Sequence, residues 1–387
     1  MRPRAAIRWK TATAALFALA AVSRAAVLPD DRADLMWHDW SGGGVTVQGP
    51  SILVRKKVTD SLSLAANYYV DMISSASVDV LSTASPYKET RTQGSISADY
   101  IHGNTTYSGG YIESNERDYK AKTGFFSVSE SMFGDLTTIS FGYTRGFDKV
   151  YAANHQLGQP ITVTFFGDAD HRNWQASLSQ ILTRNLLLGL NLETDESDGY
   201  LQSPYRSARY LGPDGLVHSE AQVTPNTRTG NAGSLQLKYY LPWHAALDGN
   251  YRLYHDTWGI LAHTVGAGYT QPVSTSWTFN GNVRYYRQTA AVFYGDLFPF
   301  EDSQNFMSRD RELAQFHDIA FGVGATWQFH PAWPHWIEKG TLNLNYNRLL
   351  ISYDDFHDFG RVGGSPDGIP LYSYGASVTQ FFISLWY

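Results

Sequence analysis

Apolar side chains recur at every second position along many segments of about ten residues, and this alternation constrains the fold more than any other feature of the chain. Leucines stand at 186, 188, 190 and 192, and residues 277–285 alternate large apolar side chains or Gly with Thr, Asn and Arg. A period of two is that of a β-strand, whose successive side chains face opposite sides. Beyond residue 25, no stretch approaches the roughly 18 consecutive apolar residues of a membrane-spanning helix. The chain is therefore predicted to be all-β.

The second face of these segments consists mostly of Ser, Thr, Asn, Gln and Gly. A soluble β-sandwich turns its polar face to bulk water and would carry many more Lys and Glu there. Charged residues make up only 17% of this chain, whereas aromatic residues make up 14%. The composition favours a transmembrane antiparallel up-and-down β-barrel, with apolar side chains towards lipid and polar ones towards the lumen. A soluble β-sandwich or propeller is the alternative fold.

Connectors of two lengths separate the predicted strands. Short connectors of turn composition fall at 59–60, 102–104, 133–135, 183–185, 242–243 and 272–273, and long ones at 73–90, 147–170, 195–228, 289–312 and 354–371. Because the two kinds largely alternate, one rim is expected to carry short periplasmic turns and the other long outer loops.

The strand count follows from this spacing. The predicted strands begin with 33–40 and 45–57 and finish with 373–387, which gives about 16 strands, or 14 if either of the first two fails. Gly49-Pro50 interrupts the second strand, because proline cannot donate to the ladder, and a bulge or bend is expected there.

The first 25 residues are interpreted as a targeting segment. A basic start is followed by an apolar run over 12–22 and by small residues at Ser23 and Ala25. This pattern predicts a signal peptide over 1–25 that is cleaved after Ala25, leaving an outer-membrane β-barrel domain over 26–387.

The last strand ends on a distinctive pattern. Phe381, Ile383, Leu385 and Tyr387 place apolar or aromatic residues at alternate positions and finish on an aromatic residue. This pattern looks like the signal that the barrel assembly machinery recognises in many bacterial outer-membrane barrels. The predicted location is the outer membrane of a Gram-negative envelope, in contact with outer-membrane lipid and lipopolysaccharide.

The sequence contains few patterns of catalytic, metal-binding or nucleic-acid-binding residues. The net charge of −6 provides no basic field for nucleic acid, and the lack of Cys excludes disulfides and thiolate ligands. None of the 12 His residues forms a helical pair with a Glu base, and His330 and His335 are interpreted as part of an interfacial loop. No catalytic residue and no cofactor are predicted, and the chain is not expected to be an enzyme.

One segment is a candidate cation site. Asp71 and Asp79 flank a Ser-rich stretch that ends near Ser85, and carboxylates with hydroxyls could bind calcium. A solvated turn is the favoured interpretation, so whether a metal binds is left open. The Asp-rich outer loops are likewise interpreted as solvated, with divalent-ion bridging to lipopolysaccharide as the alternative.

Charged residues of both signs are expected on the lumenal face. The candidate lumen-lining residues are Asp71, Glu193, Lys238, Asp248, Arg252 and Arg284. In a water-filled pore, such facing charges bias which solutes pass. A lumen filled with side chains or plugged, with these charges paired, is the alternative.

Two stretches carry a family resemblance. Residues 42–50, Gly-Gly-Gly-Val-Thr-Val-Gln-Gly-Pro, and residues 70–80, with their Ser-Ala-Ser and paired Asp, resemble a bacterial outer-membrane β-barrel family known only as domain of unknown function three-five-seven-zero. The resemblance covers the mature chain. It implies a fold and a location and no established chemistry.

The leading functional hypothesis is a porin-like or transport-related barrel without catalysis, because a polar inner face and about 16 strands suffice for a lumen. The second is a non-conducting binding or scaffold barrel of an envelope complex, with a periplasmic or lipoprotein partner. The third is an outer-membrane hydrolase built from a lumenal Ser or His.

Overall fold

The computed structural model describes residues 27–75, 87–154, 161–332, 334–358 and 368–387. The predicted signal peptide lies outside these residues, as do Asp79 and Ser85 of the candidate calcium segment. Within the described ranges, no helix is long and apolar enough to cross a membrane.

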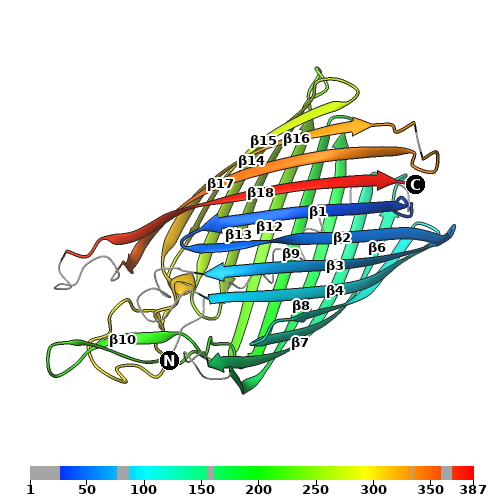
Figure 1. The fold of residues 1–387 in the computed structure, drawn as a ribbon. Helices are drawn as coiled ribbons and strands as arrows, with labels where there is room; N and C mark the ends of the chain where they lie inside the picture. Colours follow the sequence, from blue (N-terminus) through cyan, green and yellow to red (C-terminus); the bar gives the residue numbers. More distant parts are fainter. Residues whose placement is uncertain (1–26, 76–86, 155–160, 333, 359–367) are drawn as a thin grey trace.

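Sixteen antiparallel strands close into a single barrel (Figure 1). Its strands are β1 (Arg32–Gly42), β2 (Val45–Thr59), β3 (Leu62–Ser75), β4 (Tyr87–His102), β5 (Thr105–Asn115), β6 (Tyr119–Met132), β7 (Thr137–Asn154), β8 (Thr162–Thr183), β9 (Leu186–Gly199), β12 (Thr227–Tyr240), β13 (Ala246–Asp256), β14 (Leu261–Pro272), β15 (Trp277–Gln288), β16 (Phe316–Phe329), β17 (Lys339–His357) and β18 (Leu371–Trp386). The barrel closes where β1 pairs with β18, from Arg32 opposite Trp386 to Gly42 opposite Ala376. The predicted fold class and the count of 16 strands are confirmed.

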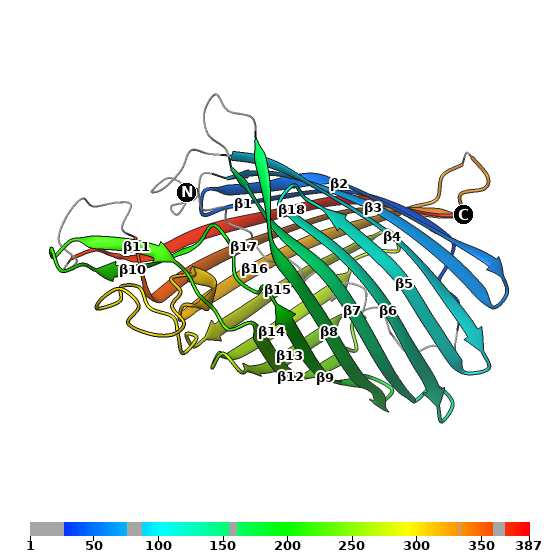
Figure 2. The same cartoon turned by 90° about the horizontal axis from the view of Figure 1, so that it is seen from below.

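Two small elements lie outside the ring of strands. The hairpin of β10 (Ser207–Leu211) and β11 (Val217–Ala221) forms a separate two-stranded sheet, and η1 (Arg311–Leu313) is a single 3₁₀ turn. Figure 2 shows the hairpin extending beyond one end of the barrel, away from the C-terminus. Both elements belong to connectors that the sequence predicts as long loops.

The connectors sort onto two rims as predicted. All six predicted short turns join strands at the rim where β1 begins and β18 ends, and all five long connectors join strands at the other rim, which we call the outer rim. Several strands are longer than predicted: β7 continues to Asn154 and β8 begins at Thr162, so the connector between them shrinks to 155–161. Both strands keep pairing there across a bulge, because two long neighbours satisfy each other's backbone groups.

Of the bulge or bend expected at Gly49-Pro50, the bulge is wrong, because no register shift occurs there. The pairing of β2 with β3 keeps one register across these residues, from Gln48 opposite Met72 to Ser51 opposite Tyr69. A Cβ at position 49 would lie 1.9 Å from the carbonyl oxygen of Val70, so glycine is needed for the close approach of the two strands. Proline is tolerated because the strands pass this point without ladder bonds.

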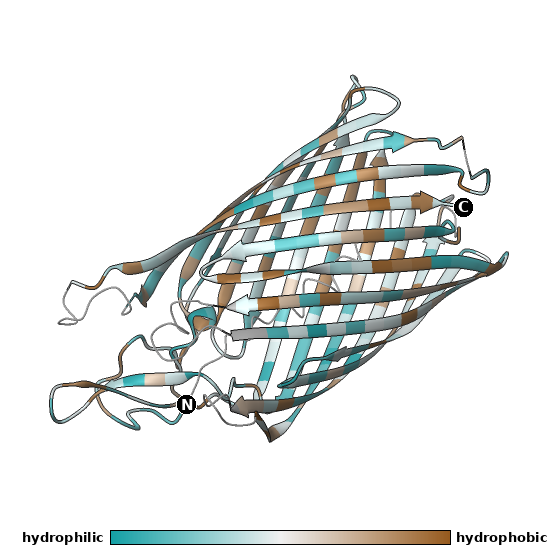
Figure 3. Cartoon of the chain, in the orientation of Figure 1, coloured by the Kyte–Doolittle hydropathy of each residue, from teal (hydrophilic) through white to brown (hydrophobic). Residues whose placement is uncertain are grey.

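The two faces of the barrel wall differ as the alternation predicts. Side chains of the outer face are large, apolar and exposed, among them Ile96 at 65%, Leu192 at 65% and Val323 at 61%. Figure 3 shows apolar and polar residues alternating along the strands. On the inner face, Gln236 and Asn282 remain exposed, so water reaches the middle of the lumen.

Aromatic side chains border the apolar face. Trp277 and Trp327 stack at the rim of short turns, with ring centroids 6.3 Å apart, and Tyr285 lies on the same face of β15 towards the outer rim. At usual strand rise and tilt, the stretch from Trp277 to Tyr285 spans about 20 Å along the barrel axis, close to the height of a lipid-facing band. We call the exposed apolar side chains of the outer face between these two levels, such as Leu192, Phe279 and Val323, the apolar belt.

Candidate functional site: the outer mouth of the lumen

The turn between β13 and β14 holds an aromatic ring at the outer end of the lumen. Asp256, which is 1% exposed, accepts hydrogen bonds of 3.0 Å from the backbone N–H groups of Trp258 and Ile260. Gly259 closes the turn with a φ of +87°, a value that glycine adopts without strain. The guanidinium of Arg228 pairs with Asp256 and lies 4.5 Å from the centroid of the Trp258 ring. One buried carboxylate therefore orders the turn and places Trp258.

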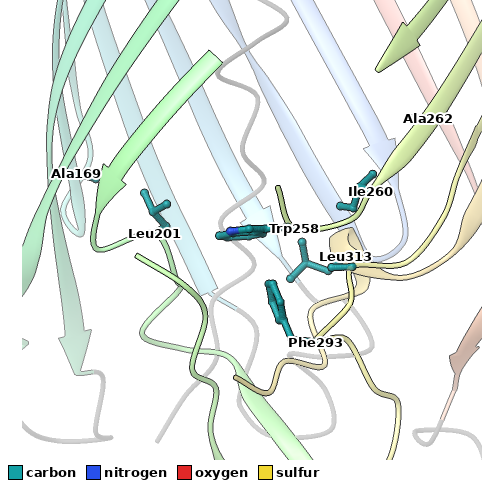
Figure 4. Close-up of a cluster of buried hydrophobic side chains, with 8 residues drawn as sticks. Ala169, Leu201, Trp258, Ile260, Ala262, Phe293 and Leu313 are labelled. Carbon is teal, nitrogen blue, oxygen red and sulfur yellow. The ribbon is translucent and has the colours of Figure 1, made fainter. Parts of the chain in front are cut away.

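The long connector 289–315, which we call the inserted segment, folds back into the mouth of the barrel. Leu313 of η1 packs in a buried apolar cluster with Trp258, Ile260 and Ala262 (Figure 4). The next residue, Ala314, packs against Ile351 and other residues of β17 and β18. Ala262 of β14 and Ile351 of β17 belong to the inner face of strands that β15 and β16 separate, so the segment lies over the inner face of this part of the wall and narrows the lumen at its mouth.

Hydrogen bonds tie the inserted segment to the wall. Gln288 Nε2 donates to the carbonyl oxygens of Glu312 at 3.0 Å and Ala314 at 2.8 Å. Tyr294 donates through its hydroxyl to the carbonyl oxygen of Asp355, at 3.1 Å. These bonds satisfy backbone groups that would otherwise be buried without partners, which would cost about 1–3 kcal/mol each.

A buried ion pair links the inserted segment to the end of β17. Arg309 Nε donates to Asp296 Oδ1 at 2.7 Å, and its Nη2 donates to the carbonyl oxygen of His357 at 2.7 Å. Asp296 Oδ2 also lies 2.7 Å from His357 Nδ1. The Arg309 guanidinium stacks 4.2 Å from the centroid of the Phe356 ring. Asp296 is thus a structural partner rather than the solvated loop residue expected from the sequence.

The loop that carries β10 and β11 contacts the inserted segment. Val223 and Met307 form a backbone bridge, and Ser308 Oγ donates to Gln222 Oε1 at 2.7 Å. Arg206 lies 3.5 Å from Asp310, which caps η1 by accepting from the Glu312 N–H. The two long loops of this half of the outer rim are therefore held together.

Asp71, a predicted lumen-lining residue, lies in a buried network on β1, β3 and β4. It is 3% exposed, and its two oxygens lie 2.8 Å from His38 Nε2 and 2.5 Å from Arg91 Nη2. The Tyr69 ring stacks on His38 with centroids 4.8 Å apart. Both oxygens of Asp71 already have partners, which argues against the calcium alternative. Among the described residues, no group of three or more His, Asp or Glu could hold a metal ion.

Two predicted lumen-lining arginines are anchored by carboxylates that lie deeper in the wall. Arg252 Nη2 donates to Glu193 Oε2 at 3.0 Å, and Arg284 Nη2 donates to Asp318 Oδ1 at 2.7 Å. The side chains of Arg252 and Arg284 are 38% and 43% exposed, whereas those of Glu193 and Asp318 are 18% and 8% exposed. The positive groups therefore reach further into the lumen than the negative ones.

The remaining two candidates stand opposite each other. Lys238 on β12 is the cross-strand neighbour of Asp248 on β13, and the Lys238 side chain is exposed. A Cβ on Gly268 would lie 2.5 Å from Asp248 Oδ1, so the carboxylate extends across the neighbouring strand at a position that has no side chain. All six candidates alternate with belt residues and so share the inner face. That they line a conducting passage remains a prediction.

A Ser–His–acid grouping occurs on the inner face of β7, β8 and β9. Ser197 Oγ lies 2.8 Å from His171 Nδ1, and His171 Nε2 lies 3.3 Å from Asp148 Oδ2. The same Asp148 oxygen accepts from the Tyr119 hydroxyl. Ser197 sits inside the sheet, paired with β8 and β12 on either side, so the ladders occupy the backbone N–H groups that a tetrahedral intermediate would need. We interpret the grouping as a polar network of the wall.

The proposed assembly signal forms the closing edge of the barrel. Phe381, Ile383 and Leu385 of β18 stand opposite Trp37, Leu35 and Ala33 of β1. Tyr387 follows the strand, and its hydroxyl donates to the carbonyl oxygen of Arg55 on β2 at 3.0 Å. Its role as a recognition signal remains a prediction.

Sequence reasoning missed several residues of the mouth. Asp318 alternates with the belt residues Ile319 and Phe321, so the period of two could have found it. Arg309 and Leu313 lie in a connector without periodicity, where the sequence offers no signal for insertion into the lumen.

Known proteins resemble this chain mainly in fold. Residues 75–340 match the family described as protein of unknown function (DUF3570). No curated protein matches the sequence. A bacterial polysaccharide outer membrane secretin superposes with a TM-score of 0.48 at 9% identity, covering 93% of this chain and 100% of that one.

Two further solved barrels are similar at the same level. A FadL homologue of Pseudomonas aeruginosa has a TM-score of 0.41 and 10% identity, covering 93% of this chain and 90% of that one. The siderophore receptor PirA from Pseudomonas aeruginosa has a TM-score of 0.41 and 9% identity, covering 93% of this chain and 63% of that one. This chain therefore spans less than two thirds of the receptor's length. At TM-scores below 0.5, these likenesses carry no functional argument.

Proposed function

This chain belongs to the DUF3570 family of proteins of unknown function, and we propose that it is a porin-like or transport-related barrel of the cell outer membrane that passes small polar solutes. The location is supported by the continuous apolar belt, because exposed apolar surface of this extent is stable only against lipid. We further propose that it carries no catalysis, since the strand ladders occupy the backbone N–H groups beside Ser197 in the described Ser–His–acid grouping.

The observation that carries the proposal is the combination of a wet lumen with a narrowed mouth. Gln236 and Asn282 are exposed on the inner face, and the arginines Arg252 and Arg284 reach past their partner carboxylates. The inserted segment then restricts the outer end through Leu313 and Ala314. A wide polar lumen with a fixed restriction admits small hydrated solutes and excludes larger ones.

Planar-bilayer recording on the purified full chain tests this function. Stepwise conductance is expected after incorporation. Absence of steps from protein that is verifiably inserted would overturn the pore. Location is tested separately, by heat-modifiable migration and recovery in the outer-membrane fraction, and recovery as soluble periplasmic protein would overturn it.

A non-conducting binding or scaffold barrel is the second candidate. It is favoured by the tight packing of the mouth, where Trp258, Phe293 and Leu313 are each at most 7% exposed and Arg309 is paired. A mouth held this firmly suits a docking platform as well as a filter. Co-purification of a periplasmic or lipoprotein partner, together with an absence of conductance, would favour this candidate over the pore.

A further inference from the structure

Five cationic side chains gather on the outward face of three neighbouring strands near the outer rim. They are Lys120 and Lys122 of β6, Arg145 and Lys149 of β7 and Arg172 of β8, and we call them the cationic patch. Their direction follows from β7, where Phe147 and Lys149 are exposed while Gly146, Asp148 and Val150 are buried. The patch therefore faces away from the lumen.

Two pairs of like charges stand directly opposite each other in this patch. Lys120 is the cross-strand neighbour of Lys149, and Arg145 is the cross-strand neighbour of Arg172. Like charges in this relation destabilise a sheet. An anion bound between them would remove the repulsion.

Nearby carboxylates compensate only part of the charge. Arg145 pairs with Asp170 at 3.0 Å, Arg172 lies 3.4 Å from Glu196, and Lys149 lies 3.9 Å from Asp168. Within the described parts of the chain, neither Lys120 nor Lys122 forms an ion pair with a carboxylate. Glu113 of β5 is the cross-strand neighbour of Lys122 but forms no ion pair with it, so the two lysines of β6 are the least compensated cations of the patch.

The patch begins where the apolar belt ends. Tyr143 and Trp174 have ring centroids 4.2 Å apart on the outward face, and the next outward positions on the same strands are Arg145 and Arg172. A hollow of about 150 Å³ lies beside it, lined by the hydroxyl groups of Ser197, Thr227 and Thr229, by Arg172 and by the carboxylates of Asp170, Glu196 and Asp198. A molecule bound here would touch apolar surface on one side and cations, carboxylates and hydroxyls on the other, and the carboxylates can accept hydrogen bonds from sugar hydroxyls.

We propose that the cationic patch binds the phosphate groups of a phosphorylated glycolipid of the outer leaflet, as in the headgroup of lipopolysaccharide. The inference rests on the proposed membrane location. The acyl chains lie along the apolar belt, the phosphates lie between Lys120, Lys122 and Lys149, and sugar hydroxyls reach the hollow. Charge-assisted bonds from Lys and Arg to phosphate are among the strongest that a protein surface makes.

The test titrates fluorescent diphosphoryl lipid A into the purified, delipidated full chain in detergent. The variant is Lys120→Gln with Lys122→Gln, which removes the two cations without carboxylate partners. The matched control is Lys56→Gln with Lys57→Gln, two exposed lysines at the opposite end of the barrel. At roughly fivefold per cation near an anionic headgroup, the patch variant is expected to bind about 30-fold more weakly, and the control unchanged.

A second readout separates binding from folding. Lipid A is expected to raise the unfolding temperature of the wild type more than that of the patch variant, whereas without lipid the variant is at least as stable, because the repulsion between Lys120 and Lys149 is gone. Equal affinity of the patch and control variants, or equal affinity for dephosphorylated lipid A, would overturn the headgroup proposal alone. Recovery of the chain as a soluble protein would overturn the membrane location, and this proposal with it.

Discussion

The side-chain amide of Gln288, on the inner face of β15, donates to the carbonyl oxygen of Ala314 across 2.8 Å. Only 6% of Gln288 is exposed, so this bond lies in the wall of the mouth rather than in open water. It holds the inserted segment at the point where the chain re-enters the barrel as β16, beside the bonds that Tyr294 and Arg309 make to β17.

Replacing Gln288 by Ala is expected to widen the mouth. The carbonyl groups of Glu312 and Ala314 lose their donor, which destabilises the docked segment by about 1–3 kcal/mol. Single-channel recording should show larger and noisier conductance steps. Gln236→Ala, on the inner face but away from the segment, is the control and should leave the steps unchanged. Identical conductance of Gln288→Ala and wild type would show that the Gln288 bonds do not hold the restriction in place.

Replacing Arg284 by Gln is expected to shift ion selectivity towards cations. The change removes a positive group from the lumen and leaves the carboxylate of Asp318 without its partner. The reversal potential in a salt gradient measures the shift. Arg287→Gln removes the same charge from the same strand on the outward face and should have no effect. A shift of the same size in both variants would contradict a lumenal role for Arg284.

Replacing Tyr387 by Ala is expected to reduce the amount of assembled barrel in cells without preventing folding in detergent. The hypothesis is that the assembly machinery recognises the aromatic end of the last strand. Immunoblots of outer-membrane fractions and heat-modifiable migration measure the two effects. Trp336→Ala is the control, because its ring centroid lies 6.1 Å from that of Tyr387 but outside the last strand. Equal losses of assembled barrel in both variants would point to lost packing instead.

Acidification is expected to release the start of β1. Asp31 lies 2.6 Å from Lys56 Nζ and accepts from the Lys57 N–H at 2.5 Å. Partial burial works to raise the pKa of Asp31, but the bonds from Lys56 and Lys57 outweigh it and hold the pKa below 3.8. Because the folded pKa is the lower one, the stabilisation is present above about pH 3.8 and is lost as the pH falls through the folded value.

The measurement for Asp31 compares urea unfolding of the wild type and Asp31→Asn. The wild type is expected to be the more stable at about pH 6, and the difference should shrink as the pH falls below 3.8 and through the lower folded pKa of Asp31. Asp30→Asn is the control, since Asp30 is exposed and lies 3.7 Å from Lys57. A difference that persists at low pH would mean that the carboxylate charge is not its cause.

Much of the barrel follows from the sequence because its signal is local. Each strand shows its inner and outer faces through alternation of its own residues, so Arg284 could be assigned to the lumen without knowing its neighbours. The lengths of the connectors likewise predicted which strand ends lie at the rim of short turns and which lie at the outer rim, because each length is also a local property of the sequence. The bulge expected at Gly49-Pro50 was wrong because the close approach of Gly49 to Val70 depends on another strand.

Contacts between residues that are distant in the sequence could not be predicted from the alternation within single strands. Asp71 could be placed on the inner face, but its burial between His38 and Arg91 depends on the register of β1, β3 and β4. Likewise, the like-charge pair of Lys120 and Lys149 appears only when β6 and β7 are aligned. Alternation determines which way a side chain points, and register determines what it meets.

The sequence by itself determined an all-β chain with a lipid-compatible face, a polar face and two unlike rims. Only the tertiary structure decided that residues 289–315 enter the mouth, where Tyr294 bonds to Asp355 and Gln288 to Ala314. The physical reason is that a strand's two faces are a property of neighbouring residues, whereas a loop without periodicity takes its position from whichever distant surface buries its apolar side chains and satisfies its backbone.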